Sequence, residues 1–220
     1  SNGVQLHVDM ESHATKDLAL AIFRQIAGED EFRDWPWCGI VIQCYLREAN
    51  RDLVALGDWA RRRGAPVWVR LVKGAYWDQE TIQARAAGWP VPVWERKWQT
   101  DACFEAATTW LLEQSPWLRP AIASHNIRSL AHAMAVAGHL GLPQHALEMQ
   151  MLYGMGDPEK AAVTAEGQRL RVYMPYGQLV PGMAYLVRRL LENSSNDSFL
   201  RAGFVKHVPP ARRKESLEEF

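Results

Sequence analysis

Two cations stand inside the apolar run VRLVKGAYWDQE, where a buried strand is expected. Arg70 and Lys73 offer hydrogen-bond donors to an anion or to a polarisable ring system. Gly74 allows the backbone to approach a ligand closely, and the rings of Tyr76 and Trp77 can stack on planar groups. Alternatively, Arg70 pairs with a carboxylate on a neighbouring strand and the two aromatic side chains belong to the core. The motif by itself leaves both interpretations open.

A second candidate is the pair of adjacent arginines in the segment YLVRRLLEN. Side chains that are neighbours on a helix point about 100° apart, so Arg188 and Arg189 cannot share one surface unless one of them faces inward. An inward guanidinium among polar strand ends suits a bidentate clamp on a carboxylate. Alternatively, Arg189 is solvated and pairs with Glu192 one turn later.

Further polar residues stand where other apolar runs end. The segment Ser124–Asn126 closes one run with hydrogen-bonding groups, and a histidine in such a place is more often structural than a ligand. Asp9 and Glu11 are two residues apart on a predicted strand, so both point to the same face. They could act as acid or base, but neutralisation of the cations described above is the favoured role.

The apolar runs and the segments between them predict alternating strands and helices. The predicted strands are residues 4–10, 39–46, 67–74, 120–125, 146–152 and 169–176. The predicted helices are residues 17–27, 51–63, 101–114, 128–140 and 181–192. Alternation of this kind indicates βαβ units and a parallel sheet, whose sites lie at the carboxyl ends of the strands.

A closed (β/α)₈ barrel needs eight such units, and six are visible. Either two units are missing on the N-terminal side, or the sheet is open and doubly wound. The segment 203–220, with its Pro-Pro break and charge-rich run, is predicted to be a linker or exposed tail. We expect the chain to be a piece of a longer protein.

Composition narrows the classes of function. The chain has 220 residues, 48% hydrophobic and 23% charged, with formal net charge zero, so one globular domain that binds no nucleic acid is expected. Three cysteines without CxxC spacing predict buried free thiols and no zinc site. No run is long and apolar enough for a membrane span, which makes the cytoplasm the default location. There is no GxGxxG, no P-loop and no cluster with metal-ligand spacing.

The segments VDMES, GIVIQCY, VRLVKGAYWDQE, ASHN, LYGMGDP, RVYMPYG and GMAYLVRRLLENSSNDSFL resemble, in order and spacing, one family. This is the proline dehydrogenase domain of the bacterial bifunctional proline-utilisation flavoenzymes (PutA). The resemblance implies a distorted (β/α)₈ TIM barrel, of which residues 1–202 are the C-terminal portion with about six of the eight units. It also implies non-covalent FAD and oxidation of L-proline to Δ1-pyrroline-5-carboxylate by hydride transfer to flavin N5, the first step of proline catabolism to glutamate.

The resemblance assigns roles to residues at matching positions. Those implied to bind FAD are Gln43, Arg70, Lys73, Gly74, Ala75, Trp77, Ser124, His125, Asn126, Glu192, Ser198 and Phe199. Those implied to line the proline site are Leu152, Tyr76, Tyr173, Tyr185 and the carboxylate clamp Arg188 and Arg189, with Asp9 holding an arginine or tyrosine of that pocket in place.

The sequence also departs from the family. Tyr153 stands where many members have histidine, and Met10 where many have alanine. Three parts of the family are absent from this sequence. They are the two earlier strands, one of which carries a lysine near the flavin, the aldehyde dehydrogenase domain and the DNA-binding arm. The implied partners are proline and a membrane quinone, and open strand edges predict a possible homo-oligomer.

Two alternatives remain beside the flavoenzyme. The chain could be a non-catalytic fragment or assembly module of that enzyme. It could also be an unrelated (β/α)-barrel enzyme acting on a small carboxylate, with the two arginines as clamp and Asp9 or Glu11 as base.

Overall fold

The computed structural model describes residues 4–174, 176, 177, 183 and 187. The chain divides into two compact units, Ser1–Tyr173 and Met174–Phe220, and the helices and strands below all belong to the first. The predicted boundary after residue 202 and most of the predicted helix 181–192 lie outside the described residues. The two described residues within that helix, Met183 and Val187, are helical.

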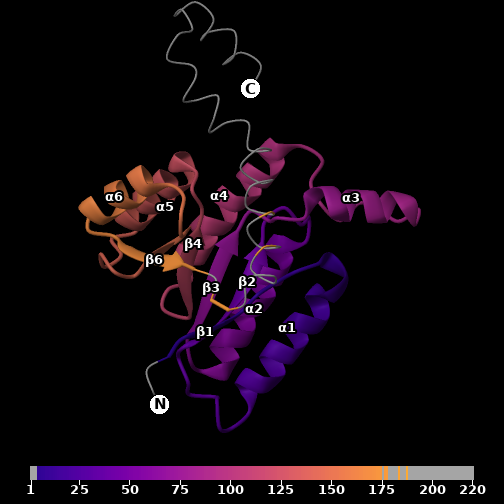
Figure 1. The fold of residues 1–220 in the computed structure, drawn as a ribbon. Helices are drawn as coiled ribbons and strands as arrows, with labels where there is room; N and C mark the ends of the chain where they lie inside the picture. The colour runs from indigo at the N-terminus through magenta and orange to yellow at the C-terminus, as the bar shows by residue number, and fades with distance from the viewer. Residues whose placement is uncertain (1–3, 175, 178–182, 184–186, 188–220) are drawn as a thin grey trace, which may run out of the picture. The chain divides into compact units, whose positions relative to one another are not determined.

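The sheet confirms the prediction of six parallel strands. Its strands follow one another in chain order, and each pairs in parallel with the next. They are β1 (Leu6–Val8), β2 (Cys38–Gln43), β3 (Val67–Val72), β4 (Leu118–Ala123), β5 (Glu148–Leu152) and β6 (Arg169–Tyr173). The sheet curls into a half-barrel, as Figure 1 shows, which agrees with an incomplete (β/α)₈ barrel rather than with an open doubly wound sheet.

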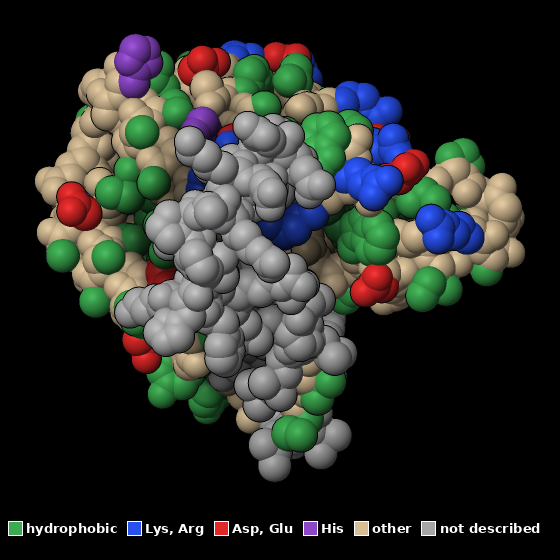
Figure 2. All heavy atoms as spheres, turned by 90° about the horizontal axis from the view of Figure 1, so that it is seen from above, with side chains coloured by type: hydrophobic (Ala, Val, Ile, Leu, Met, Phe, Trp, Pro, Cys, Tyr) green, Lys and Arg blue, Asp and Glu red, His purple; other side chains and the backbone are tan. Residues whose placement is uncertain are grey.

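Within the described part of the first unit, six helices accompany the strands. They are α1 (His13–Gly28), α2 (Ala49–Arg63), α3 (Trp77–Ala86), α4 (Lys97–Glu113), α5 (Ile127–His139) and α6 (Asp157–Ala165). The predicted helices before residue 141 correspond to α1, α2, α4 and α5, whereas α3 and α6 were not predicted. Helix α3 projects away from the sheet (Figure 1), and Figure 2 shows hydrophobic and basic side chains along this projection.

Because side chains alternate along a strand, the sheet has one buried apolar face and one face that is polar along β5 and β6. Val69 and Leu71 of β3, with Ile122 of β4, point toward the helices and are fully buried in the main core. The alternate residues face the inside of the curl, and they are polar along β5 and β6: Glu148, Gln150, Arg169 and Arg171. The core therefore lies between sheet and helices, while the inner face carries hydrogen-bonding groups.

Two further sequence predictions can be compared with the fold. Cys38, Cys44 and Cys103 are free and buried, as predicted. Among the described residues, no helix is both long and apolar enough to cross a membrane.

Candidate active site

The predicted site residues of the first unit stand at one edge of the sheet. Because parallel strands all end at the same edge, Asp9, Gln43, Lys73 and Leu152 follow or close four different strands there. Tyr173 closes β6. The half-barrel thus gathers side chains that are up to 164 residues apart in the sequence, counted from Asp9 to Tyr173.

Arg70 of β3 is the centre of this edge. Its Nη1 donates to the carboxylate of Asp9, and its Nε donates to Oε1 of Gln150 at 2.7 Å. Its guanidinium carbon lies 5.8 Å from the ring centroid of Tyr173, within the range of a cation–π contact. The Arg70 side chain is only 15% exposed. The carboxylate pairing considered from the sequence is therefore present, and it links β3 with β1, β5 and β6.

The second cation of the motif is also paired. Lys73 forms an ion pair with Asp101 of α4, and its Nζ lies 5.5 Å from the ring centroid of Phe104. Burial raises the pKa of Asp101, but the hydrogen bond and charge of Lys73, with the charge of Lys97, outweigh it and keep that pKa below its ordinary value. Lys73 is thus held at the strand end by α4.

The aromatic residues of the motif are fixed by hydrogen bonds at the base of α3. The hydroxyl of Tyr76 donates to the carboxylate of Glu11. The indole Nε1 of Trp77 donates to the carbonyl oxygen of Trp94 at 2.6 Å, and the Trp77 side chain remains 39% exposed. Trp77 is therefore no core residue, and its accessible ring agrees with the stacking interpretation.

The segment after β4 makes local contacts. The Asn126 side chain accepts from the backbone N–H of Ser129 at 3.1 Å and caps α5. Ser124 Oγ accepts from the backbone N–H of Asn126 at 3.0 Å. His125 Nε2 accepts from the backbone N–H of Leu152 at 3.0 Å. This segment consequently joins the ends of β4 and β5, and the role of His125 at a cofactor stays a prediction.

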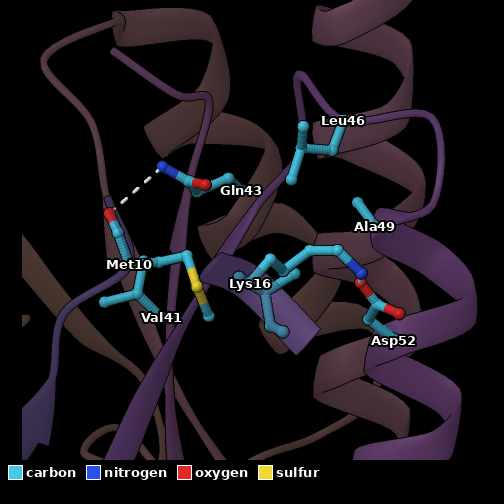
Figure 3. A pocket seen from close by; sticks show the side chains of 8 residues that line it. Met10, Lys16, Val41, Gln43, Leu46, Ala49 and Asp52 are labelled. Atoms are coloured by element: carbon cyan, nitrogen blue, oxygen red, sulfur yellow. Dashed lines mark hydrogen bonds and ion pairs between the residues drawn. The ribbon is translucent and has the colours of Figure 1, made fainter. Parts of the chain in front are cut away.

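Gln43 lies beside a small cavity near the end of β2, shown in Figure 3. Its Nε2 donates to the carbonyl oxygen of Met10 at 3.2 Å, which fixes the orientation of the amide. Its Oε1 is buried and has no hydrogen-bond partner among the described residues. The free volume of the cavity is about 10 Å³, about the space that one water molecule needs.

On the other side of this cavity, Lys16 is 2% exposed and contacts three carboxylates. Its Nζ lies 2.7 Å from Asp17, 3.0 Å from Glu48 and 2.6 Å from Asp52. Burial lowers the pKa of Lys16, but its hydrogen bonds to the three carboxylates outweigh burial and raise that pKa overall. The three carboxylates are close enough to one another to ligate a metal ion, but the Lys16 ammonium group already contacts all three and Arg51 contacts Glu48 and Asp52.

Sequence reasoning missed a buried ionic network on the inner face of β5 and β6. Glu148 is fully buried and accepts from Arg171 at 2.7 and 2.9 Å. Arg169 Nε lies 3.1 Å from Glu148, and Gln150 Nε2 donates to it at 2.7 Å. Arg171 also donates to Gln5 at 2.6 Å, which ties β6 to the segment before β1. The alternation of polar and apolar residues in EMQML and RLRVY could have revealed this network.

The remaining predicted site residues have no described geometry. Tyr185, Arg188, Arg189, Glu192, Ser198 and Phe199 lie outside the described residues, so their roles remain predictions. Of the two departures from the family pattern, Met10 is buried in the core and Tyr153 is 69% exposed.

A curled parallel sheet with cations, amides and aromatic rings at its carboxyl edge belongs to the class of (β/α)-barrel proteins, whose sites lie at that edge. Within that class the sequence is specific: residues 1–202 match the family described as proline dehydrogenase. The chain belongs to the proline dehydrogenase family.

Individual relatives agree with this assignment. The chain is 36% identical to the bifunctional protein PutA of Salmonella typhimurium over 204 residues, which are 90% of this chain and 15% of that protein. It is 29% identical to proline dehydrogenase 1 of Bacillus subtilis over 92% of this chain and 59% of that protein. The crystal structure of proline utilization A from Bdellovibrio bacteriovorus, inactivated by N-propargylglycine, is 50% identical, with a TM-score of 0.90 over 96% of this chain and 22% of that chain. The chain therefore spans a small part of its bifunctional relatives.

Proposed function

We propose that the protein to which this chain belongs is a flavin-dependent proline dehydrogenase that oxidises L-proline to Δ1-pyrroline-5-carboxylate. The observation that carries the proposal is the family match over residues 1–202, joined to the gathering of Arg70, Asp9 and Tyr173 at the carboxyl edge. The chain spans 15% of the Salmonella relative, so the activity of the whole protein is inferred from this one part.

The residues at the carboxyl edge fit FAD as the cofactor. Arg70 has five N–H groups, and the contacts given above for the described residues engage its Nε and Nη1. The buried Oε1 of Gln43 is an acceptor that a ring N–H of a flavin, or a water, can satisfy. The exposed ring of Trp77 suits stacking on a planar base. The edge thus offers donors, an acceptor and a stacking surface.

The protein's part in the reaction is positioning. Arg70, Lys73 and Trp77 would hold a flavin, which would supply the acceptor for a hydride from the substrate carbon next to nitrogen. Asp9 and Gln150 hold the guanidinium of Arg70 from two sides, so its remaining donors keep a fixed direction. Asp101 holds Lys73 in the same way from α4. Arg188 and Arg189 are the predicted clamp on the proline carboxylate.

Binding of FAD by the chain can be measured directly. The purified chain is incubated with FAD, freed of excess cofactor, and its visible spectrum is recorded before and after anaerobic addition of L-proline. A retained flavin spectrum that bleaches with proline supports cofactor, substrate and hydride transfer together. A colourless protein contradicts activity of this chain by itself and favours the non-catalytic fragment.

The clamp is tested in the intact parent enzyme with Arg189→Lys. Lysine offers a point charge where a planar fork is needed, so proline turnover should fall at least about tenfold. Arg128→Lys is the matched control, because Arg128 is 82% exposed and contacts only Glu105 among the described residues. Unchanged proline turnover in Arg189→Lys would contradict the clamp.

We further propose an electron acceptor, an oligomeric state and a cellular compartment. A membrane quinone as electron acceptor rests on the family resemblance alone. A homo-oligomer is supported by the strand order, because β1 and β6 each pair with one strand only among the described residues. Light scattering of the purified chain measures its mass, and a monomer would contradict the oligomer.

The three free thiols support a reducing compartment such as the cytoplasm.

A further inference from the structure

The loop between β3 and α3 has an unusual backbone at Gly74. Its φ is +128°, a region that residues with side chains rarely adopt. A Cβ placed on Gly74 would lie 2.3 Å from Cδ1 and 2.4 Å from Cγ of Tyr45. The close approach that the sequence suggested at Gly74 is therefore made to the ring of Tyr45. Tyr45 is 2% exposed, so its ring lies inside the protein under this loop.

Tyr45 holds the same loop through its backbone. Its N–H donates to the carbonyl oxygen of Lys73 at 2.6 Å, immediately before Gly74. Its carbonyl oxygen accepts from the N–H of Trp94 at 2.9 Å. Trp94 supplies the carbonyl oxygen that binds the indole of Trp77. Tyr45 thus connects the loop to the segment that holds the Trp77 ring.

The ring of Tyr45 belongs to a small hydrophobic cluster, separate from the main core. Its buried members are Tyr45, Leu46 and Val93, and Tyr76 packs against them. Removal of the ring would leave a cavity under Gly74 and beside Tyr76, into which the loop can collapse.

The hydroxyl of Tyr45 has a different status from the ring. It is buried and has no hydrogen-bond partner among the described residues. Burial, followed by the nearby Glu80, Tyr76 and Glu11, raises the pKa of Tyr45, so the hydroxyl stays neutral. The ring rather than the hydroxyl therefore shapes the loop.

We propose that Tyr45 is a positioning residue for the loop that carries Lys73, Gly74 and Tyr76. Its ring sets how closely the backbone at Gly74 approaches the end of β2, and thereby where the Lys73 and Tyr76 side chains stand. The geometry is independent of any ligand. The consequence for FAD rests on the proposed function above.

The first test needs no cofactor. Amide hydrogen exchange is measured at Glu80, whose N–H donates to Tyr76, and at Trp94, whose N–H donates to Tyr45. Tyr45→Leu should speed exchange at both amides at least about tenfold, because the support of the loop is lost. Tyr45→Phe should leave both unchanged. Phe23→Leu is the matched control, since Phe23 is 5% exposed in the main core on α1.

Equal exchange at these two amides in Tyr45→Leu and Phe23→Leu would overturn the proposal, as would a Tyr45→Phe variant that behaves like Tyr45→Leu. A second comparison uses Gly74→Ala. In the wild-type background the new methyl group meets the ring, whereas in Tyr45→Leu part of that space is free. Gly74→Ala should therefore cost less stability in the Tyr45→Leu background, and an equal cost in both would also overturn the proposal.

The cofactor test then uses FAD itself. Tyr45→Leu should weaken FAD binding at least about tenfold, while Tyr45→Phe and Phe23→Leu keep the wild-type affinity. Unchanged FAD affinity in Tyr45→Leu would overturn the role in the cofactor site. A wild-type chain that binds no FAD would instead count against the proposed function of this chain, and the exchange comparison would still decide the role of Tyr45.

Discussion

Replacement of Glu148 by glutamine should destabilise the half-barrel strongly. The carboxylate is fully buried and is the shared partner of Arg169 and Arg171. Removal of one charge from a buried ion pair costs about 3–5 kcal/mol, because the partners are left uncompensated. The two arginine side chains are 42% and 41% exposed, so water can recover part of this loss. We therefore expect a loss at the low end of the range, about 3 kcal/mol.

The assay is urea unfolding followed by far-ultraviolet circular dichroism. With a slope of roughly 3 kcal/mol per molar urea for a chain of this size, the midpoint should fall by about 1 M. Glu95→Gln is the matched control, because Glu95 is 70% exposed and lies 3.3 Å from Arg47. An exposed pair contributes about 0–1 kcal/mol. If the two variants lost the same stability, the buried network would not hold β5 and β6 as argued.

The pH dependence follows from the same network. Burial raises the pKa of Glu148, but the hydrogen bonds from Arg171 and Gln150 and the charges of the two arginines outweigh it and lower that pKa overall. A carboxyl group with a lowered pKa stabilises the fold above its unfolded pKa, and this stabilisation is lost as pH falls through the folded value. The stability difference between wild type and Glu148→Gln should therefore shrink below about pH 4.5. A difference that stays constant down to pH 3 would contradict this.

Two further predictions concern the basic side chains His7 and Lys16. Burial, and then the charge of Arg70, lower the pKa of His7 to about 4, so the neutral ring is favoured in the fold. The stability that His7 contributes should therefore decline as pH falls from 6.5 toward 4. An NMR titration midpoint of His7 near 6.5 would refute this prediction. Lys16→Gln leaves three neighbouring carboxylates without their shared cation and should cost about 3 kcal/mol in urea unfolding. The control is Lys97→Gln, because the Lys97 side chain is 59% exposed, and it should cost at most about 1 kcal/mol. Equal losses in the two variants would show that the burial of Lys16 does not increase its contribution to stability.

The strands were predictable because each buried strand is a short apolar run between turn residues. VWVRLV and GIVIQ are examples, and both lie in the middle of the sheet. Five of the six predicted strands extend two or three residues beyond the observed carboxyl ends, whereas the predicted strand 146–152 ends with β5 at Leu152. The residues beyond the observed strand ends include Asp9 and Lys73, which are predicted site residues.

The two missed helices lack the pattern that predicts a helix. Helix α3 projects from the sheet and exposes Ile82 at 66%, so it has no continuous apolar stripe. Helix α6 has nine residues and buries Val163 alone. The sequence did contain a local signal for the start of α6. Proline in the first turn and Asp157 at the first position are typical of a helix N-terminus.

Only some contacts of the described site residues were predictable from the sequence, and their roles stay predictions. Asp9 was expected to neutralise a cation such as Arg70, and it does, because both face the inside of the curl at the same edge. The partner of Lys73 was not foreseen, since Asp101 belongs to a helix 28 residues later and no periodicity relates the two. Contacts between elements depend on how helices pack, which a strand pattern does not specify.

The pairing of Arg70 also changes how the opening motif is interpreted. Pairing with a carboxylate and presentation of donors to a ligand first stood as alternatives. In the structure Arg70 uses Nε toward β5 and Nη1 toward β1, and a guanidinium offers five N–H groups in a planar fork. Among the described residues, two fixed contacts therefore orient the fork and still leave donors for a ligand, so the structural role of Arg70 supports its proposed role at the cofactor.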